Sequence, residues 1–276
     1  MAVQHEAFDF RGTRCVRLRH DDGATAIIAL HGAQVLSWTP ADGRERLFLG
    51  ERADFAPGGA IRGGIPVVFP QFADRGTLRK HGFARLQDWT FEDVVEDVAV
   101  FTLHDGPGSA AWPHRFACRV AVALAARGLS VTLEVENRDD ASFAFSAALH
   151  TYLCVGDIAQ VALEGLQGCD YEDSANGGTL HRETADALRF EGELDRIYGD
   201  VVAPLSLVEE GRRLGVEQDG FSDVVVWNPG DALARRIGDL APGEYRRFAC
   251  VEAGQVLQPV MLAPGERWRG SQVLGD

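Results

Sequence analysis

The sequence predicts an all-β protein, built as a large sandwich or barrel of short strands. Apolar and polar residues alternate wherever a period is visible, most clearly at residues 129–136, where every odd position is apolar. This is the pattern of a strand with one buried face. Similar short stretches recur between clusters of Gly, Pro, Asp and Asn. No stretch sustains an apolar repeat of 3.6 residues over several turns, so a doubly wound α/β fold is not favoured.

The expected strands follow this alternation along the chain. Residues 119–124 and 129–136 form a predicted β-hairpin, with a short turn at Ala126-Arg127-Gly128. The other expected strands span residues 24–30, 35–39, 98–103, 143–155, 224–227, 248–252 and 256–262. The glycine-rich stretch at residues 57–64 is too short for a linker and is interpreted as an ordered, tightly turning loop.

Length and composition favour one domain that covers residues 1–276. With 46% hydrophobic residues the chain can bury a large core, and all-β domains of this size are common. The N-terminus lacks a basic segment followed by an apolar stretch, and no window reaches the roughly 18 apolar residues of a membrane span. We therefore expect a cytoplasmic protein.

Charge and cysteine content narrow the partners further. The net charge of −14 argues against nucleic acid and anionic membranes as partners, because both require a basic surface. The five cysteines are scattered rather than paired, and are interpreted as reduced core thiols.

Several common active-site motifs are absent from the sequence. There is no phosphate-binding G-x-x-x-x-G-K-[ST] loop, no G-x-G-x-x-G turn and no G-x-S-x-G elbow. His150 and Cys154 are four residues apart, but one such pair would leave zinc short of ligands. We therefore expect neither a metal nor an organic cofactor.

Two glycine-containing segments supply candidate cationic ligands. Arg62 stands among apolar residues and glycines, and Gly63 and Gly64 are expected to let the backbone approach a ligand closely. The alternative is that Arg62 pairs with a structural carboxylate. Lys80, His81 and Arg85 gather positive charge within six residues of an acidic chain, which suits a phosphate; the alternative is a solvated basic turn.

Two further segments supply candidate acid–base groups. On an extended strand His150 would share a face with Tyr152 and could line a pocket, although a hydrogen-bonded core histidine is the alternative. Glu252 ends an apolar run, where burial would raise its pKa and make it a better base. The alternative for Glu252 is a strand-end carboxylate paired with an arginine.

Together these segments resemble the hexose-6-phosphate mutarotase branch of the aldose 1-epimerase superfamily, from about residue 24 to the C-terminus. The pieces that carry the resemblance, in the family's order, are RGGIPVVFPQF (62–72), HGFAR (81–85), ALHTYL (148–153), DRIY (195–198), VVVWNP (224–229) and CVEAG (250–254). The resemblance implies a single-domain, large antiparallel β-sandwich, the galactose mutarotase-like supersandwich, with the sugar in a groove across one sheet.

The resemblance also implies roles for individual residues. It makes Glu252 the base and His150 the acid in cofactor-independent interconversion of the α and β anomers of a hexose 6-phosphate. The remaining matches are implied to bind the substrate: Arg62 and Arg85 its phosphate, Asp195 the sugar hydroxyls and His81 the ring. Lys80 departs from the family, which often has an uncharged residue there, and is a further candidate phosphate ligand.

Two other functions remain open on the sequence. The chain could act on unphosphorylated hexoses, although two arginines would then meet no anion. It could instead bind a sugar phosphate without catalysis, although binding alone needs no acid–base pair. In each case the expected partner is a small sugar, and a monomer or weak homodimer is expected.

Overall fold

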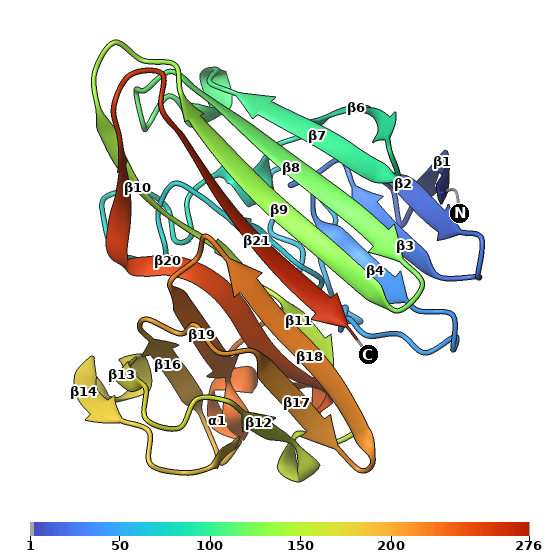
Figure 1. Ribbon diagram of the computed structural model, residues 1–276, viewed down its shortest axis with the longest axis vertical. Coiled ribbons are helices and arrows are strands. Elements are labelled where there is room, and N and C mark those ends of the chain that lie inside the picture. The colour runs from blue at the N-terminus through green and yellow to red at the C-terminus, as the bar shows by residue number, and fades with distance from the viewer. Residues whose placement is uncertain (1–2, 276) are drawn as a thin grey trace.

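A computed structural model describes residues 3–275, whose strands form three antiparallel sheets. The smallest consists, in order, of β1 (Val3–Phe10), β2 (Thr13–His20), β3 (Thr25–Ala29) and β4 (Val35–Thr39). The largest has nine strands, in the order β15 (Ala187–Arg189), β12 (Ala162–Glu164), β17 (Leu205–Glu209), β18 (Arg212–Asp219), β21 (Arg267–Gly275), β9 (Gly128–Asn137), β8 (Phe116–Ala125), β7 (Val98–His104) and β6 (Thr90–Val95). In Figure 1 its strands β7, β8, β9 and β21 run side by side.

The third sheet has eight strands and carries the candidate site. Its order is β14 (Thr179–Arg182), β13 (Asp170–Asp173), β16 (Leu194–Tyr198), β19 (Asp223–Asn228), β20 (Phe248–Leu262), β10 (Phe143–Leu149) and β5 (Val67–Val68), and β11 (Tyr152–Cys154) also pairs with β20. Helices are short: α1 (Gly230–Ala234) and the 3-10 turns η1 (Ala84–Leu86), η2 (Pro107–Ser109), η3 (Ile158–Gln160), η4 (Ser174–Asn176) and η5 (Glu244–Arg247). Among the described residues, no helix has the length and apolar character needed to cross a membrane.

The main core lies between the eight- and nine-stranded sheets. One buried apolar cluster contains residues of both sheets: Phe101 and Val120 of the nine-stranded sheet, and Phe145 and Val251 of the eight-stranded sheet. Buried apolar area of this kind stabilises by roughly 25 cal/mol per Å². The all-β prediction is confirmed, and the packing of two sheets makes the molecule a sandwich.

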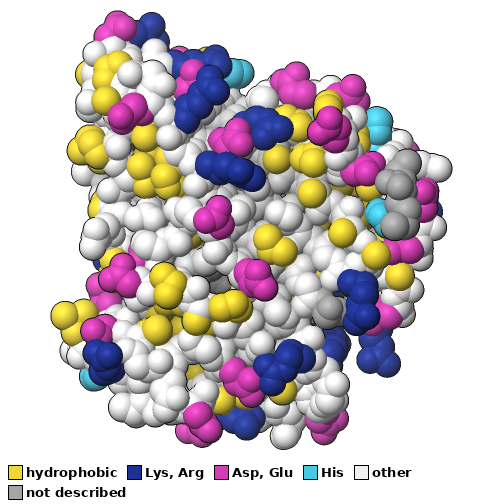
Figure 2. Space-filling model, in the orientation of Figure 1, with side chains coloured by type: hydrophobic (Ala, Val, Ile, Leu, Met, Phe, Trp, Pro, Cys, Tyr) yellow, Lys and Arg dark blue, Asp and Glu magenta, His cyan; other side chains and the backbone are white. Residues whose placement is uncertain are grey.

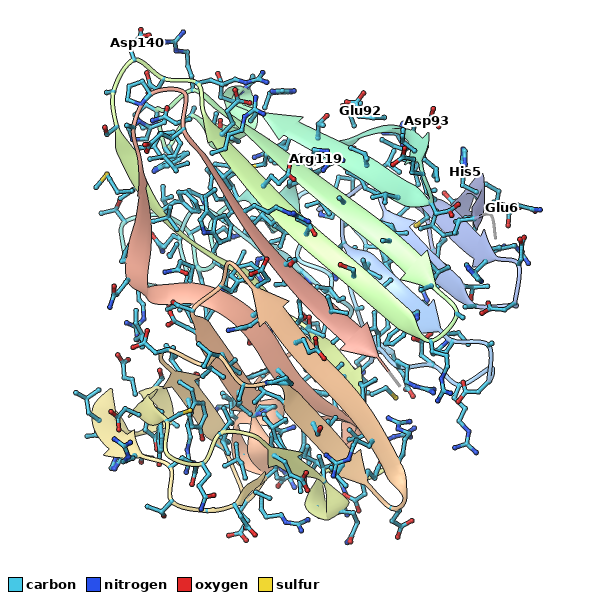
Figure 3. All side chains as sticks on the ribbon, in the orientation of Figure 1. His5, Glu6, Glu92, Asp93, Arg119 and Asp140 are labelled. Atoms are coloured by element: carbon cyan, nitrogen blue, oxygen red, sulfur yellow. The ribbon has the colours of Figure 1, made fainter. Side chains whose placement is uncertain are left out.

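The outer face of the nine-stranded sheet is a surface of exposed ion pairs. Arg119 of β8, labelled on this sheet in Figure 3, lies 3.5 Å from Glu134 of β9. Figure 2 shows basic and acidic side chains interspersed over the same view of the molecule. Such pairs contribute only about 0–1 kcal/mol each to stability. Because the two signs of charge are mixed, this face offers no concentrated charge of one sign.

Strand positions agree with the alternation pattern where one face is buried. The predicted strands 35–39 and 129–136 correspond to β4 and β9. The hairpin turn has two residues, because Gly128 already pairs with Ala125 and belongs to β9.

Two strand predictions were wrong in their extent. The strand predicted at 143–155 is interrupted, because the backbone N–H of His150 bonds to Pro66 and that of Thr151 to Leu149. The strands predicted at 248–252 and 256–262 are one strand, β20, which continues through Gly254. The strand pairing shifts at a bulge in this part of β20. The Asp223 carboxylate holds the bulge, because it accepts hydrogen bonds from the backbone N–H groups of Val256 and Leu257 at 2.7 and 2.8 Å.

Candidate active site

A cavity lies on the outer face of the eight-stranded sheet, and strand alternation determines which side chains reach it. On β20, Val251 and Ala253 belong to the core between the sheets. Glu252 therefore points to the opposite face, where it lines the cavity. The same alternation on β16 and β19 brings Asp195 and Trp227 to this face.

One wall comes from the segment between β5 and η1, and Gly82 fixes its path. Gly82 has φ +68°, and a Cβ there would lie 2.1 Å from the carbonyl oxygen of Phe69, so only glycine fits. This turn directs the neighbouring His81 and Lys80, together with Arg85 of η1, into the cavity. The HGFAR segment is therefore built around a glycine that allows close backbone packing.

The cavity has a volume of about 370 Å³, within the range of small-molecule sites. Its walls are formed by Arg62, Phe72, Ala73, Lys80, His81, Arg85, His150, Glu193, Asp195, Val225, Trp227, Leu233, Ile237 and Glu252. All seven residues that the sequence analysis singled out for catalysis or binding are among them. The structure thus brings these seven side chains together from five separate segments of the chain.

His150 and Glu252 are the closest pair of titratable groups in the cavity. Nδ1 of His150 lies 3.2 Å from Oε1 of Glu252. The contact does not have hydrogen-bond geometry: among the described residues, neither His150 Nδ1 nor Glu252 Oε2 has a hydrogen-bond partner. Glu252 is 1% exposed and His150 7%, so these lone pairs are also largely shielded from water. Each buried polar atom left unpaired costs about 1–3 kcal/mol. A catalytic role is one explanation for such atoms in a folded protein.

Burial shifts the proton affinities of this pair in opposite directions. It raises the pKa of Glu252 well above its usual value, and the nearby Asp195 carboxylate adds to the effect. It lowers the pKa of His150 well below its usual value, with further contributions from His81 and Arg85. Both shifts favour the uncharged form of the group concerned.

An aromatic wall holds the His150 ring. The ring stacks on Tyr152 with centroids 4.8 Å apart and planes at 8°, as the sequence led us to expect, and Trp227 packs edge-on at 6.0 Å. The Tyr152 hydroxyl accepts a hydrogen bond of 2.8 Å from Nη1 of Arg62. The imidazole is thus held by packing.

Arg62 is paired within the protein, as the structural alternative for it supposed. Its Nε donates to both carboxylate oxygens of Asp239 at 3.2 Å, and its Nη2 lies 3.2 Å from one of them. The interactions with Tyr152 and Asp239 raise the pKa of Arg62. Its charge is largely compensated before any ligand binds.

Arg85 differs from Arg62 because its charge is not compensated. Its Nη2 donates to the carbonyl oxygen of Lys80 at 3.0 Å, and its buried Nε has no hydrogen-bond partner among the described residues. Burial lowers the pKa of Arg85 to about 10. A guanidinium in this state is ready to bind an anion.

His81 is a neutral hydrogen-bond donor toward the cavity. Its Nδ1 accepts a hydrogen bond of 3.3 Å from the backbone N–H of Ala73, which leaves the proton on Nε2. Burial, followed by the charges of Arg85 and Lys80, lowers the pKa of His81 to about 2. Its φ of +63° is unusual for a residue with a side chain, and the local turn imposes it.

The carboxylate of Asp195 is expected to lower the free energy of unfolding of the protein. Burial raises the pKa of Asp195 from 3.8 to about 6, so the folded protein binds more protons than the unfolded chain between these values. Stability therefore falls as pH rises through this window. We expect Asp195→Asn to raise the free energy of unfolding by about 1–3 kcal/mol above pH 6 and to weaken substrate binding.

Urea unfolding across this pH range would test the Asp195 prediction. The difference between Asp195→Asn and the unsubstituted protein should grow from pH 4 to pH 6 and then level off. Asp186→Asn, which removes an exposed carboxylate, is the control and should show no such trend. Parallel stability curves for Asp195→Asn and the unsubstituted protein would contradict the prediction.

One expectation, for the glycines next to Arg62, needs correction. Gly63 and Gly64 do not let the backbone approach a ligand. A Cβ on Gly63 would lie 2.3 Å from the carbonyl oxygen of Phe48, and one on Gly64 would lie 2.1 Å from that of Val35. These glycines therefore allow close packing of the chain against itself, and this packing positions Arg62.

Sequence reasoning did not single out several lining residues. Glu193 stands immediately before β16 and two positions before Asp195, so extended chain at this point would have placed both side chains on one face. Leu233 and Ile237 lie in and after α1, and Asp239 in the following segment holds Arg62. No local pattern marks these three, because only the folded chain brings them to the sheet.

A second cavity, of about 440 Å³, lies beside β4 and η5, and backbone hydrogen bonds occupy carboxylates in its wall. Two of its three carboxylates are engaged by the backbone: Glu45 accepts N–H groups of Trp38 and Leu47, and Glu244 accepts that of Glu51. The carboxylate of Glu51, the third, belongs to an exposed residue. The His150–Glu252 pair is the more reactive arrangement, and we therefore assign the active site to the first cavity.

The chain matches a known sequence family over most of its length. Residues 14–275 match the family described as "Aldose 1-epimerase". A protein of Cenchrus ciliaris named "Putative glucose-6-phosphate 1-epimerase" is 37% identical over 94% of this chain and 83% of its own length. One of the same name from Escherichia coli strain K12 is 36% identical over 82% of this chain and 78% of its own length.

Solved structures share the architecture. A crystal structure described as a putative mutarotase from Salmonella typhimurium superposes with a TM-score of 0.90 at 29% identity, covering 98% of this chain and 92% of the other. A galactose mutarotase-like protein from Lactobacillus casei superposes with a TM-score of 0.75 at 18% identity, covering 99% of each chain, and shows likeness of fold alone.

Proposed function

This chain belongs to the aldose 1-epimerase family, and we propose that it interconverts the α and β anomers of a hexose 6-phosphate, glucose 6-phosphate being the expected substrate. One observation carries the proposal: the His150–Glu252 pair shares a cavity with Arg85, a partly buried cation that has no carboxylate partner among the described residues. The pair suits proton transfer at the anomeric centre, and the cation suits the phosphate.

The proposed reaction moves one proton on and one proton off the sugar. The Glu252 carboxylate takes the proton of the anomeric hydroxyl while protonated His150 gives one to the ring oxygen. The C1–O5 bond breaks, and the open-chain aldehyde forms. Rotation about C1–C2 presents the other carbonyl face, and ring closure with both transfers reversed gives the opposite anomer.

The resting pair holds the single proton that this scheme needs. When both groups are uncharged the proton is on Glu252, whereas ring opening requires it on His150. The two forms differ only in which residue of the pair carries this proton, so the scheme needs no further proton from solvent. Because the return half-reaction exchanges the acid and base roles, each residue serves both roles in one turnover.

The remaining residues bind and orient the substrate in this proposal. Arg85 is the main phosphate ligand, with Lys80 and Arg62 contributing, although the pairing of Arg62 with Asp239 reduces its share. Asp195 accepts hydrogen bonds from sugar hydroxyls, and His81 donates one to the ring. Fixing the phosphate holds the ring while C1 turns.

Two alternatives fit the cavity less well. An epimerase acting on free hexoses would bury the Arg85 charge without an anion to meet it, at a cost in stability. A protein that only binds sugar phosphates would have no use for an unpaired carboxyl next to an unpaired imidazole. A single domain over residues 1–276, a cytoplasmic location and a monomer or weak homodimer complete the proposal.

Optical rotation or NMR of freshly dissolved α anomers tests the proposal. We expect the protein to accelerate equilibration of α-glucose 6-phosphate far more than that of α-glucose. Equal acceleration of both sugars would favour an epimerase of free hexoses. Acceleration of neither would overturn the enzymatic function and leave a sugar-phosphate binding protein.

A further inference from the structure

Cys250 lies beside the acid–base pair and has no part in the proposed reaction. His150, Cys250 and Glu252 each offer one ligand atom, and these atoms all lie within 4.8 Å of one another. The side chains of Cys250 and Glu252 point to the same face of β20, because the residues are two positions apart. All three residues are more than nine-tenths buried.

The free lone pairs of this cluster are those a metal ion would use. His150 Nδ1 and Glu252 Oε2 lack hydrogen-bond partners among the described residues. Two nitrogen or oxygen ligands of one tetrahedral zinc are about 3.3–3.6 Å apart, given bonds of about 2.0–2.2 Å. The 3.2 Å between His150 Nδ1 and Glu252 Oε1 is close to this spacing. The Cys250 sulfur lies within 4.8 Å of the other two ligand atoms and has to move closer to bind the same ion.

The ligand types select the kind of cation. A thiolate, an imidazole and one carboxylate suit Zn²⁺, Co²⁺ or Cd²⁺, whereas Mg²⁺ and Ca²⁺ prefer oxygen ligands alone. Two anionic ligands and a divalent ion form a neutral group, which lowers the cost of burying it. Binding displaces the Cys250 thiol proton, and that of Glu252 where it is protonated, to the solvent.

We infer that His150, Cys250 and Glu252 form an inhibitory site for a thiophilic divalent cation such as Zn²⁺. The ion would occupy lone pairs that the proposed reaction needs on both His150 and Glu252. His150 and Glu252 line the cavity, so the fourth coordination position faces it and is open to water. The inhibition rests on the proposed function, but the metal binding does not.

Cobalt spectroscopy tests binding without any assay of activity. Titration of the unsubstituted protein with Co²⁺ should produce a sulfur-to-cobalt charge-transfer band that saturates at one ion per chain. Cys250→Ala should lack the band, and Cys118→Ala, which removes an equally buried thiol from β8, should keep it. Absence of the band in the unsubstituted protein, or its persistence in Cys250→Ala, would overturn the inference.

Zinc inhibition provides the second readout. Cys250→Ala should retain the basal rate on glucose 6-phosphate and require at least about tenfold more Zn²⁺ for half-inhibition, since even changes around metal ligands alter affinity this much. Cys118→Ala should be inhibited like the unsubstituted protein. Equal zinc sensitivity of Cys250→Ala and the unsubstituted protein would rule the site out.

Discussion

Glu252→Gln should lower kcat on glucose 6-phosphate by about 10²- to 10⁴-fold, the usual contribution of a positioned acid–base group, with little change in KM. Glutamine keeps the shape of the side chain and cannot take a proton from the anomeric hydroxyl. Because the Glu252 carboxyl already lacks a hydrogen-bond partner for Oε2, the substitution breaks no hydrogen bond at that atom. Sugar binding through Arg85 and Asp195 should therefore persist.

Glu244→Gln is the matched control for this substitution. Glu244 is also buried, but its carboxylate accepts hydrogen bonds from the backbone N–H groups of Glu51 and Ala241, outside the active-site cavity. Its replacement should lower stability and leave kcat unchanged. The rates come from anomer exchange by NMR, and circular dichroism verifies the fold of each variant. A kcat for Glu252→Gln close to that of the unsubstituted protein would remove Glu252 from the chemistry.

Local sequence predicts a strand only where one face is buried over several residues. β9 was visible because one face is buried against the other sheet, so polarity alternates along it. β14 is exposed at every position, and β12 has three residues, so neither carries a period long enough to see. β20 was split at Gly254 because glycine usually ends a pattern, whereas the bulge held by Asp223 lets this strand continue.

The sequence also predicted residues that line one cavity in the structure. His150, Glu252 and Arg85 could be found because polar groups inside apolar runs are rare and costly. Their state could not be found, because it depends on partners far away in sequence. Asp239 has no local sequence feature that marks it, because its partner Arg62 lies 177 positions away in the chain. The resulting difference between Arg62 and Arg85 exists only in the folded protein.

Arg85→Met and Arg62→Met should change stability in opposite directions, although the chemical change is the same. Arg85 is a partly buried cation with a buried, unpartnered Nε and no carboxylate partner among the described residues, so its removal should stabilise the protein. Arg62→Met leaves Asp239 and the Tyr152 hydroxyl without their partner, which should cost about 1–3 kcal/mol. Thermal or urea unfolding of both variants measures this difference.

Arg85→Met should also distinguish binding of the phosphate from binding of the sugar. A charge-assisted hydrogen bond contributes about 1.5–3 kcal/mol, so Arg85→Met should raise KM for glucose 6-phosphate by about 10- to 100-fold and lower kcat much less. Any slow reaction of free glucose should be unaffected, because it has no anion to lose. Equal losses on both sugars would mean that Arg85 orients the ring or the acid–base pair. A loss confined to the phosphorylated sugar, in a variant more stable than the unsubstituted protein, would show that the fold sacrifices stability to keep this cation unpaired for the substrate's anion.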